Sequence, residues 1–130
     1  MKPPVRRQDL LYPELSYRII GCAFDVYNSL GSGYHEKYYH RALIEAFAEK
    51  RIAFQTELQI PVRFKHKVIG SKKMDFLVDH KVVVELKKGN SFSKSHIDQV
   101  LEYLRTQGFK LAILINFGSH GILFKRIINL

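Results

Sequence analysis

The chain has 130 residues and a mass of 15.2 kDa, the usual size of a single domain with one hydrophobic core. Its 46% hydrophobic residues exclude wholesale disorder. The longest uncharged apolar run, residues 111–117, is far shorter than the roughly 20 residues that span a bilayer, and the N-terminal sequence MKPPVRRQDLL lacks the apolar stretch of a signal peptide. We therefore predict one domain over residues 1–130, located in the cytoplasm and without a membrane partner.

The chain is strongly basic, with 21 Lys and Arg residues against 12 Asp and Glu residues and a net charge of +9. The excess is concentrated between residues 50 and 73, where Glu57 is the only acid. Such a segment suits a polyanionic partner, and it is equally typical of a well-solvated surface. If the segment binds nucleic acid, the candidate contact residues are Arg63, Lys65, Lys67, Lys72 and Lys73.

Three segments have the apolar periodicity of helices. The first covers residues 13–30, with its proline in the first turn. The second follows a glycine-rich turn and ends near residue 50. The third begins at Ser95, which we predict as its N-cap, and ends at Gly108. The single cysteine, Cys22, falls on the apolar side of the first helix, so we interpret it as structural.

Five further segments have the composition of strands. Residues 54–65 alternate between apolar and polar side chains, which predicts a half-buried strand, and Pro61 indicates a sheet edge or a bulge because it has no amide hydrogen. The other predicted strands are residues 72–78 and 82–87, which form a hairpin around residues 79–81, then 111–115 in the interior of the sheet and 121–128. The order ααβββαββ predicts an α/β fold with a mixed β-sheet flanked by helices.

Two acids inside the apolar hairpin strands need a physical reason. If the loop has three residues, Asp75 pairs with Glu85, and both carboxylates leave the same face with Cβ atoms about 4.5–5.5 Å apart. Two adjacent carboxylates repel unless a cation lies between them, and hard oxygen ligands suit Mg²⁺ or Mn²⁺. Lys87 lies on the same face and could orient a water molecule. The alternative is a surface ion pair among these three residues.

Two other places offer polar side chains. Glu36 falls in the first turn of the second helix, where it could face the sheet or simply complement the helix dipole. His96, Gln99 and Tyr103 form a polar line beside the apolar stripe of the third helix, and such a line is often only solvated.

These residues resemble a known family. The sequence GSGYHEKYY is similar to the signature of the GxxExxY family, with its glycine, glutamate and tyrosine at Gly33, Glu36 and Tyr39. The segments MDFLVDHKVVVELKK, HIDQVLEYL, LAILINFG and GILFKRIIN resemble that family in the same order, so the likeness covers about residues 15–129. The family is similar to the PD-(D/E)XK nuclease superfamily, which implies a restriction-endonuclease-like core.

The resemblance also implies roles for individual residues. In that superfamily a divalent metal ion, Mg²⁺ or Mn²⁺, is surrounded by acids that match Glu36, Asp75 and Glu85, together with the backbone carbonyl of Leu86, while Lys87 completes the catalytic motif. These matches make Glu36, Asp75, Glu85, Lys87, Gln99 and Tyr103 the predicted catalytic set.

Two of those residues, Gln99 and Tyr103, match the QxxxY element of RecB-like nucleases, where it supports the active site or contacts the nucleic acid. One departure is Met74, which stands where the superfamily nominally has a proline.

We therefore predict a Mg²⁺-dependent nuclease that hydrolyses phosphodiester bonds. Two alternatives stay open: a non-catalytic nucleic-acid-binding module that keeps the fold, and a small interaction protein whose basic face binds an acidic protein. The sequence does not distinguish DNA from RNA, and we expect DNA as the partner. It is compatible with a homodimer.

Overall fold

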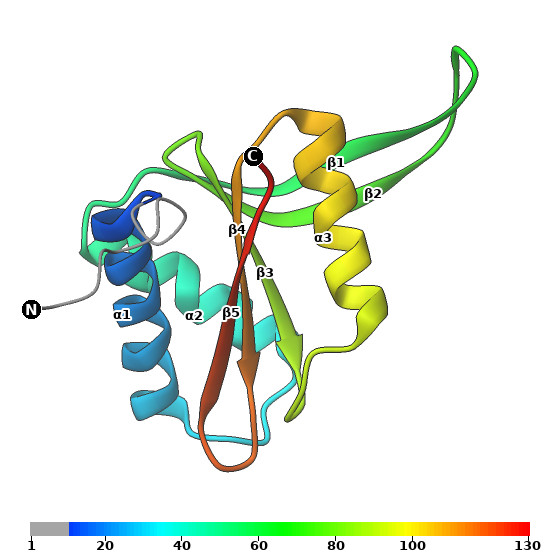
Figure 1. Ribbon diagram of the computed structural model, residues 1–130. Helices are drawn as coiled ribbons and strands as arrows, with labels where there is room; N and C mark the ends of the chain where they lie inside the picture. Colours follow the sequence, from blue (N-terminus) through cyan, green and yellow to red (C-terminus); the bar gives the residue numbers. More distant parts are fainter. Residues whose placement is uncertain (1–10) are drawn as a thin grey trace, which may run out of the picture.

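The computed structural model describes residues 11–130 and contains helices and strands in the predicted order (Figure 1). The helices are α1 (Pro13–Leu30), α2 (Glu36–Glu49) and α3 (Lys94–Gln107). The strands are β1 (Phe54–Phe64), β2 (Lys67–Val78), β3 (Val82–Lys88), β4 (Leu111–Phe117) and β5 (Ile122–Ile128).

The strands form one mixed sheet in the order β1-β2-β3-β4-β5. Neighbours are antiparallel except β3 and β4, which are parallel and are connected through α3. A parallel pair needs such a crossover, because the chain must return to the same end of the sheet. The prediction of a mixed sheet flanked by helices is confirmed.

The sheet separates two hydrophobic clusters. Helices α1 and α2 cover one face through residues such as Ile19, Leu43 and Phe47, which pack on Val84 and its neighbours. Helix α3 covers the other face, where Leu104 packs on the opposite side of the sheet. The apolar stripes that predicted the three helices are therefore the surfaces that they bury.

The interior position predicted for residues 111–115 is confirmed, since every residue of β4 is buried and the strand lies between β3 and β5. The end of α3 at Gly108, with a left-handed φ of 75°, is confirmed as well. The N-cap at Ser95 is wrong. Ser93 caps the helix by accepting a hydrogen bond from the His96 N–H at 3.1 Å, and the His96 ring accepts one from the Ser93 N–H in return. A histidine in the place usually taken by Glu or Gln conceals this capping box in the sequence.

The first hairpin differs from its prediction at its far end. β2 begins at Lys67, five residues before the predicted start, and the half-burial predicted along β1 stops at Val62. The position of Pro61 is confirmed, because β1 is an edge strand and the pairing register shifts next to it, between Val62 and Arg63. Beyond these residues the two strands project from the body of the molecule (Figure 1).

Among residues 11–130, no helix combines the length and the apolar character needed to cross a bilayer. The N-terminal sequence in which we find no signal peptide lies almost wholly outside the described residues.

Candidate active site

Strands β2 and β3 pair only at their turn-proximal ends. Val78 pairs with Val82, and the register continues to Phe76 and Val84, as the three-residue loop predicts. The next position would join Asp75 to Glu85, and here the regular backbone pairing ends. The two strands therefore separate at the two acids that the sequence marks as unusual.

Where the backbone hydrogen bonds between β2 and β3 end, carboxylates accept hydrogen bonds from the backbone N–H groups instead. The Asp75 N–H donates to Oε1 of Glu85 at 3.0 Å, and the Leu86 N–H donates to Oδ2 of Asp75 at 2.8 Å. The Lys88 N–H, two residues further along β3, donates to the carboxylate of Glu36. Because the amides of alternate residues in a strand point to the same side, these acids satisfy the edge of β3 that β2 no longer covers.

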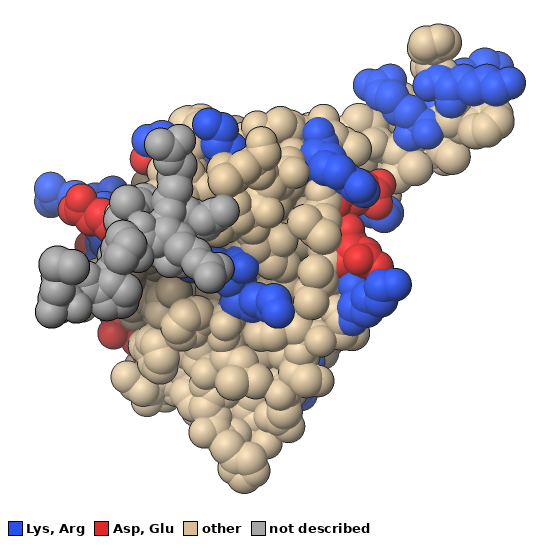
Figure 2. Space-filling model, in the orientation of Figure 1, with Lys and Arg blue, Asp and Glu red and all other residues tan. Residues whose placement is uncertain are grey.

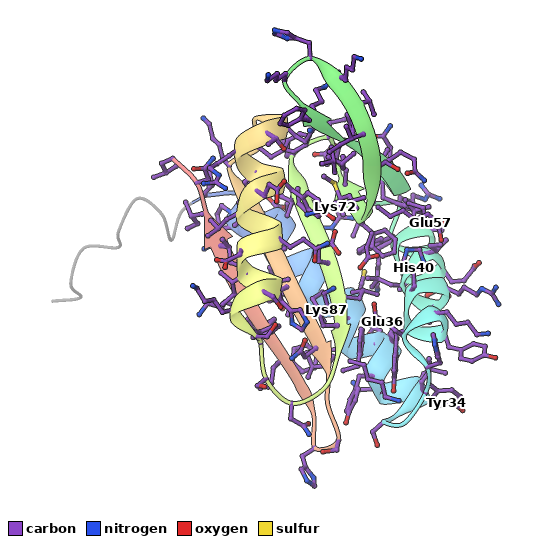
Figure 3. All side chains as sticks on the ribbon, turned by 90° about the vertical axis from the view of Figure 1, so that its right-hand side faces the viewer. Tyr34, Glu36, His40, Glu57, Lys72 and Lys87 are labelled. Carbon is purple, nitrogen blue, oxygen red and sulfur yellow. The ribbon has the colours of Figure 1, made fainter. Side chains whose placement is uncertain are left out.

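The position of Glu36 follows from the turn before α2. Tyr39 donates its hydroxyl hydrogen to the Gly31 carbonyl at 2.6 Å and accepts a bond from the Tyr34 N–H at 3.3 Å. Gly33 within this turn has a φ of 94°, which a glycine adopts without strain. The tyrosine thus fastens the turn, and the helix starts at Glu36 with its side chain directed to the end of β3 (Figure 3).

The pKa values of two glutamates in the site are raised. Burial raises the pKa of Glu85, which is only 2% exposed, to about 9, and the negative charge of Asp75 adds to this rise. Burial and the Asp75 charge also raise the pKa of Glu36, while the cation of Lys87 acts in the opposite direction. The charges of these side chains interact strongly. Without a cation, Glu85 is protonated at neutral pH.

Lys87 lies at the same end of β3 as Glu36 (Figure 3). Lys87, Glu85 and Val83 share one face of β3 by alternation, the face that packs against α3. Its charge also lowers the pKa of His96, after the larger effect of burial. In the described part of the chain no salt bridge joins Lys87 to a carboxylate, so the alternative of a surface ion pair with Asp75 and Glu85 is not supported.

Helix α3 supports the site from the other side. The side-chain amide of Gln99 donates to the Tyr103 hydroxyl at 2.9 Å, and that hydroxyl donates to the Lys73 carbonyl at 3.1 Å. Burial and then the charge of Glu85 raise the pKa of Tyr103 to about 12, so the phenol keeps its hydrogen. The pair therefore holds β2 two residues before Asp75, and the solvated line that the sequence also allowed does not describe Tyr103, which is buried.

A pocket of about 720 Å³ opens beside Asp75 and Glu36, between α2 and the β1–β2 hairpin. The sequence interpretation missed two of its polar residues, His40 and Thr56. The Thr56 hydroxyl lies 3.0 Å from Nε2 of His40 and donates to the Asp75 carbonyl at 3.0 Å. The spacing of four residues puts Glu36 and His40 on one helix face, a local signal that could have placed His40 beside the site, although it does not point to Thr56.

The predicted nucleic-acid contacts are dispersed over two regions. Arg63, Lys65 and Lys67 lie at the projecting end of the first hairpin, and all three are exposed. Lys73 lines the pocket beside Asp75, whereas Lys72 forms an exposed ion pair of 3.4 Å with Glu102 on α3.

The oxygen atoms of the site's carboxylates are the kind of ligand that a hard divalent cation prefers, but their positions do not converge on one point. Within residues 11–130, no group of three or more His, Cys, Asp or Glu side chains is placed so that it could hold a metal ion. Asp75 and Glu85 nevertheless meet side by side, and the Leu86 carbonyl faces the same edge as its N–H. Mg²⁺ commonly uses one or two carboxylates and completes its shell with water and substrate phosphate.

The architecture, a mixed sheet flanked by helices with two acids and a lysine where two strands part, defines the restriction-endonuclease-like class of α/β proteins. A family model described as the PD-(D/E)XK nuclease superfamily matches residues 13–127. This chain belongs to that superfamily.

Two solved structures match this chain, the first of them with a similar fold. The crystal structure of SSO0001 superposes with a TM-score of 0.57 and 18% sequence identity, covering 95% of this chain and 60% of that one. The alkaline exonuclease LHK-Exo from Laribacter hongkongensis gives a TM-score of 0.49 and 12% identity, covering 88% of this chain and 82% of the exonuclease. A comparison with curated proteins finds no match.

Proposed function

We propose that this chain is a divalent-metal-dependent nuclease that hydrolyses phosphodiester bonds. The observation that carries the proposal is the parting of β2 and β3, where Asp75 and Glu85 exchange hydrogen bonds with the backbone in place of a regular ladder. Membership of a nuclease superfamily supports it. A merely structural role for these acids is a poor explanation, since Glu85 is buried with its pKa raised to about 9.

Four groups would hold the cation: the carboxylates of Glu36, Asp75 and Glu85, and the backbone carbonyl of Leu86. A bound Mg²⁺ or Mn²⁺ supplies Lewis acidity, which activates water and neutralises negative charge on the phosphate. The electrostatics favour such a ligand, because a divalent charge would oppose both the burial and the Asp75 repulsion that raise the pKa of Glu85.

The remaining residues position the reacting groups. Lys87, whose charge reaches Glu36 and Glu85, would orient the attacking water and stabilise developing negative charge on the phosphoryl oxygens. Gln99 and Tyr103 are positioning residues, since they fix the backbone of β2 at Lys73 and touch neither acid through a hydrogen bond.

We also assign the chain to the GxxExxY type of this superfamily. In this chain the three residues of that signature act together: Tyr39 fastens the turn that contains Gly33, and the turn places Glu36 at the start of α2. We propose DNA as the substrate. The cytoplasmic location, the single domain over residues 1–130 and a homodimer stay predictions.

The second candidate function is a nucleic-acid-binding module without catalysis. The absence, within residues 11–130, of three converging ligands is the observation that favours it.

A cleavage assay tests the proposal. Labelled single-stranded, duplex and branched DNA, and RNA, are incubated with Mg²⁺ or Mn²⁺ and the wild-type protein or its Glu85→Ala variant. We expect cleavage by the wild type and none by the variant. Glu45→Gln is the matched control, because it removes an exposed acid from α2 and should leave cleavage unchanged. Equal cleavage by wild type and Glu85→Ala, or none by either with both metals, would overturn the proposal.

A further inference from the structure

The end of the first hairpin carries a surface that the cleavage site does not explain. We call residues 61–71 the arm. Ile60 on β1 and Met74 on β2 are the last residues of these strands that reach a hydrophobic core, and every arm residue except Val62 is exposed. Figure 1 shows the arm as a two-stranded ribbon that projects from the body. An isolated hairpin gains little stability in water, so the arm contributes little to the fold.

The arm exposes large apolar side chains that such a ribbon would be expected to avoid. Phe64, Val68 and Ile69 are 61%, 57% and 65% exposed. Ile69 lies at the register shift, where Val62 pairs with Gly70 and Arg63 with Val68, so no residue of β1 is opposite it. Exposed apolar groups gathered at one place mark a contact surface.

Cations are interleaved with these apolar groups. Phe64 pairs with Lys67, and Arg63 pairs with Val68 on the opposite face, because directly paired residues of antiparallel strands share a face. Each face of the arm therefore presents an apolar side chain beside a positive charge. The sequence contains no acid between Glu57 and Asp75, and Figure 2 shows Lys and Arg side chains gathered along the arm, with other residues between them.

We propose that the arm is a groove-reading element for duplex DNA: it enters the major groove, its cations contact the phosphates on either side, and Phe64, Val68 and Ile69 contact base edges. This inference rests on the proposed function, whose substrate class it names. A two-stranded ribbon fits the major groove of B-form DNA, where thymine methyl groups offer apolar contacts. The deep, narrow major groove of A-form RNA excludes side chains, so duplex RNA should not be bound in this way.

The arm and the candidate active site belong to the same strand, which fixes their separation. Asp75 lies eight residues along β2 from Lys67, and at about 3.3 Å per residue this separation is roughly 26 Å. This length corresponds to about 8 base pairs of B-form DNA. A duplex held by the arm could therefore reach Asp75 within one helical turn, which favours nucleic acid over an anionic membrane as the occupant.

The test uses binding without metal, so that it does not depend on cleavage. Fluorescence anisotropy in EDTA compares wild type with the double variant Phe64→Ser, Ile69→Ser, which keeps every charge. For duplex DNA we expect about a tenfold weaker affinity or more, the loss that follows when even one buried apolar side chain is removed from a contact. Single-stranded DNA and duplex RNA of the same sequence should bind the two proteins alike. Tyr17→Ser, which removes an 80% exposed aromatic side chain from α1, is the matched control and should change nothing.

A second measurement locates the groove. Replacing thymine by 5-iodouracil puts a photoreactive atom where the thymine methyl lies in the major groove. We expect crosslinks to peptides of the arm, and their loss on Phe64→Ser. The inference would be overturned if the double variant lost affinity equally for all nucleic acids, if it lost none for duplex DNA, or if crosslinks formed outside the arm. Binding to vesicles that contain phosphatidylserine is measured as well, and an effect of the double variant confined to these vesicles would also overturn the inference. Arm-dependent duplex binding without any cleavage in Mg²⁺ or Mn²⁺ would instead refute the proposed nuclease activity and leave this inference standing.

Discussion

Replacing Glu85 by glutamine should stabilise the metal-free protein while abolishing cleavage. The pKa of Glu85 rises from 4.5 to about 9 in the folded protein, mainly because the side chain is buried. Between these two values the folded protein holds a proton that the unfolded chain has released. The free energy of unfolding therefore falls as pH rises from the lower value, and the loss is complete only above the higher one.

The size of the effect follows from the same values. Each pKa unit corresponds to about 1.4 kcal/mol, so between about pH 5 and about pH 8 Glu85 alone should lower the unfolding free energy by roughly 4 kcal/mol at most. Glutamine stays neutral throughout, and its Oε1 can still accept the hydrogen bond from the Asp75 N–H. At the upper pH, Glu85→Gln should therefore be more stable than the wild type, although the variant lacks a proposed metal ligand.

Urea unfolding followed by circular dichroism in EDTA, at several pH values across this range, measures the effect. Glu36 also has a raised pKa and contributes to the wild-type slope, so the informative quantity is the difference between wild type and variant. That difference should widen steadily with pH, whereas the control Glu45→Gln, on the exposed side of α2, should follow the wild type. A constant difference between Glu85→Gln and wild type would refute the reasoning, because Glu85 would then ionise normally in the folded protein.

Further expected outcomes concern the other site residues. Asp75→Ala should abolish cleavage and leave metal-free DNA affinity unchanged or higher, since it removes a negative charge that faces a polyanion; weaker filter binding would contradict this. Lys87→Ala should also abolish cleavage, with slightly reduced affinity. Lys65→Glu with Lys67→Glu should weaken binding to every sequence alike and flatten the salt dependence by up to about two units of slope, whereas an unchanged slope means that neither lysine touches phosphate. Tyr103→Phe should lower kcat by roughly tenfold at constant KM, as expected for a positioning residue, and a rise in KM alone would refute that role.

The register of the second hairpin could be predicted because one assumption, a three-residue loop, decides it. Val78 and Val82 pair as expected, and Asp75 and Glu85 therefore come together. The end of the ladder at these residues could not be predicted, because a pattern of side chains does not say which backbone groups are hydrogen-bonded to side chains instead. Leu86 carries no sign in the sequence that its N–H will bind a carboxylate.

The projecting arm was missed for a related reason. Alternation predicts the length of β1, but it also predicts a half-buried face to the end of the strand, and beyond Val62 both faces are exposed. The start of β2 at Lys67 is likewise concealed, because its first seven residues are all exposed. Likewise, the contact between His40 and Thr56 joins α2 to β1, and such a long-range pair leaves no local periodicity to detect.

The acids at the parting of β2 and β3 also protect the protein from self-association. Where β2 turns away, β3 would otherwise offer open amides to any passing strand, and such an edge is a template for intermolecular pairing. The carboxylates of Asp75 and Glu36 occupy the amides of Leu86 and Lys88, and they add negative charge that repels the backbone carbonyls of an incoming chain. Variants that delete both acids should lose this protection along with the proposed metal ligands, so the side chains proposed to serve cleavage would also keep the sheet from growing.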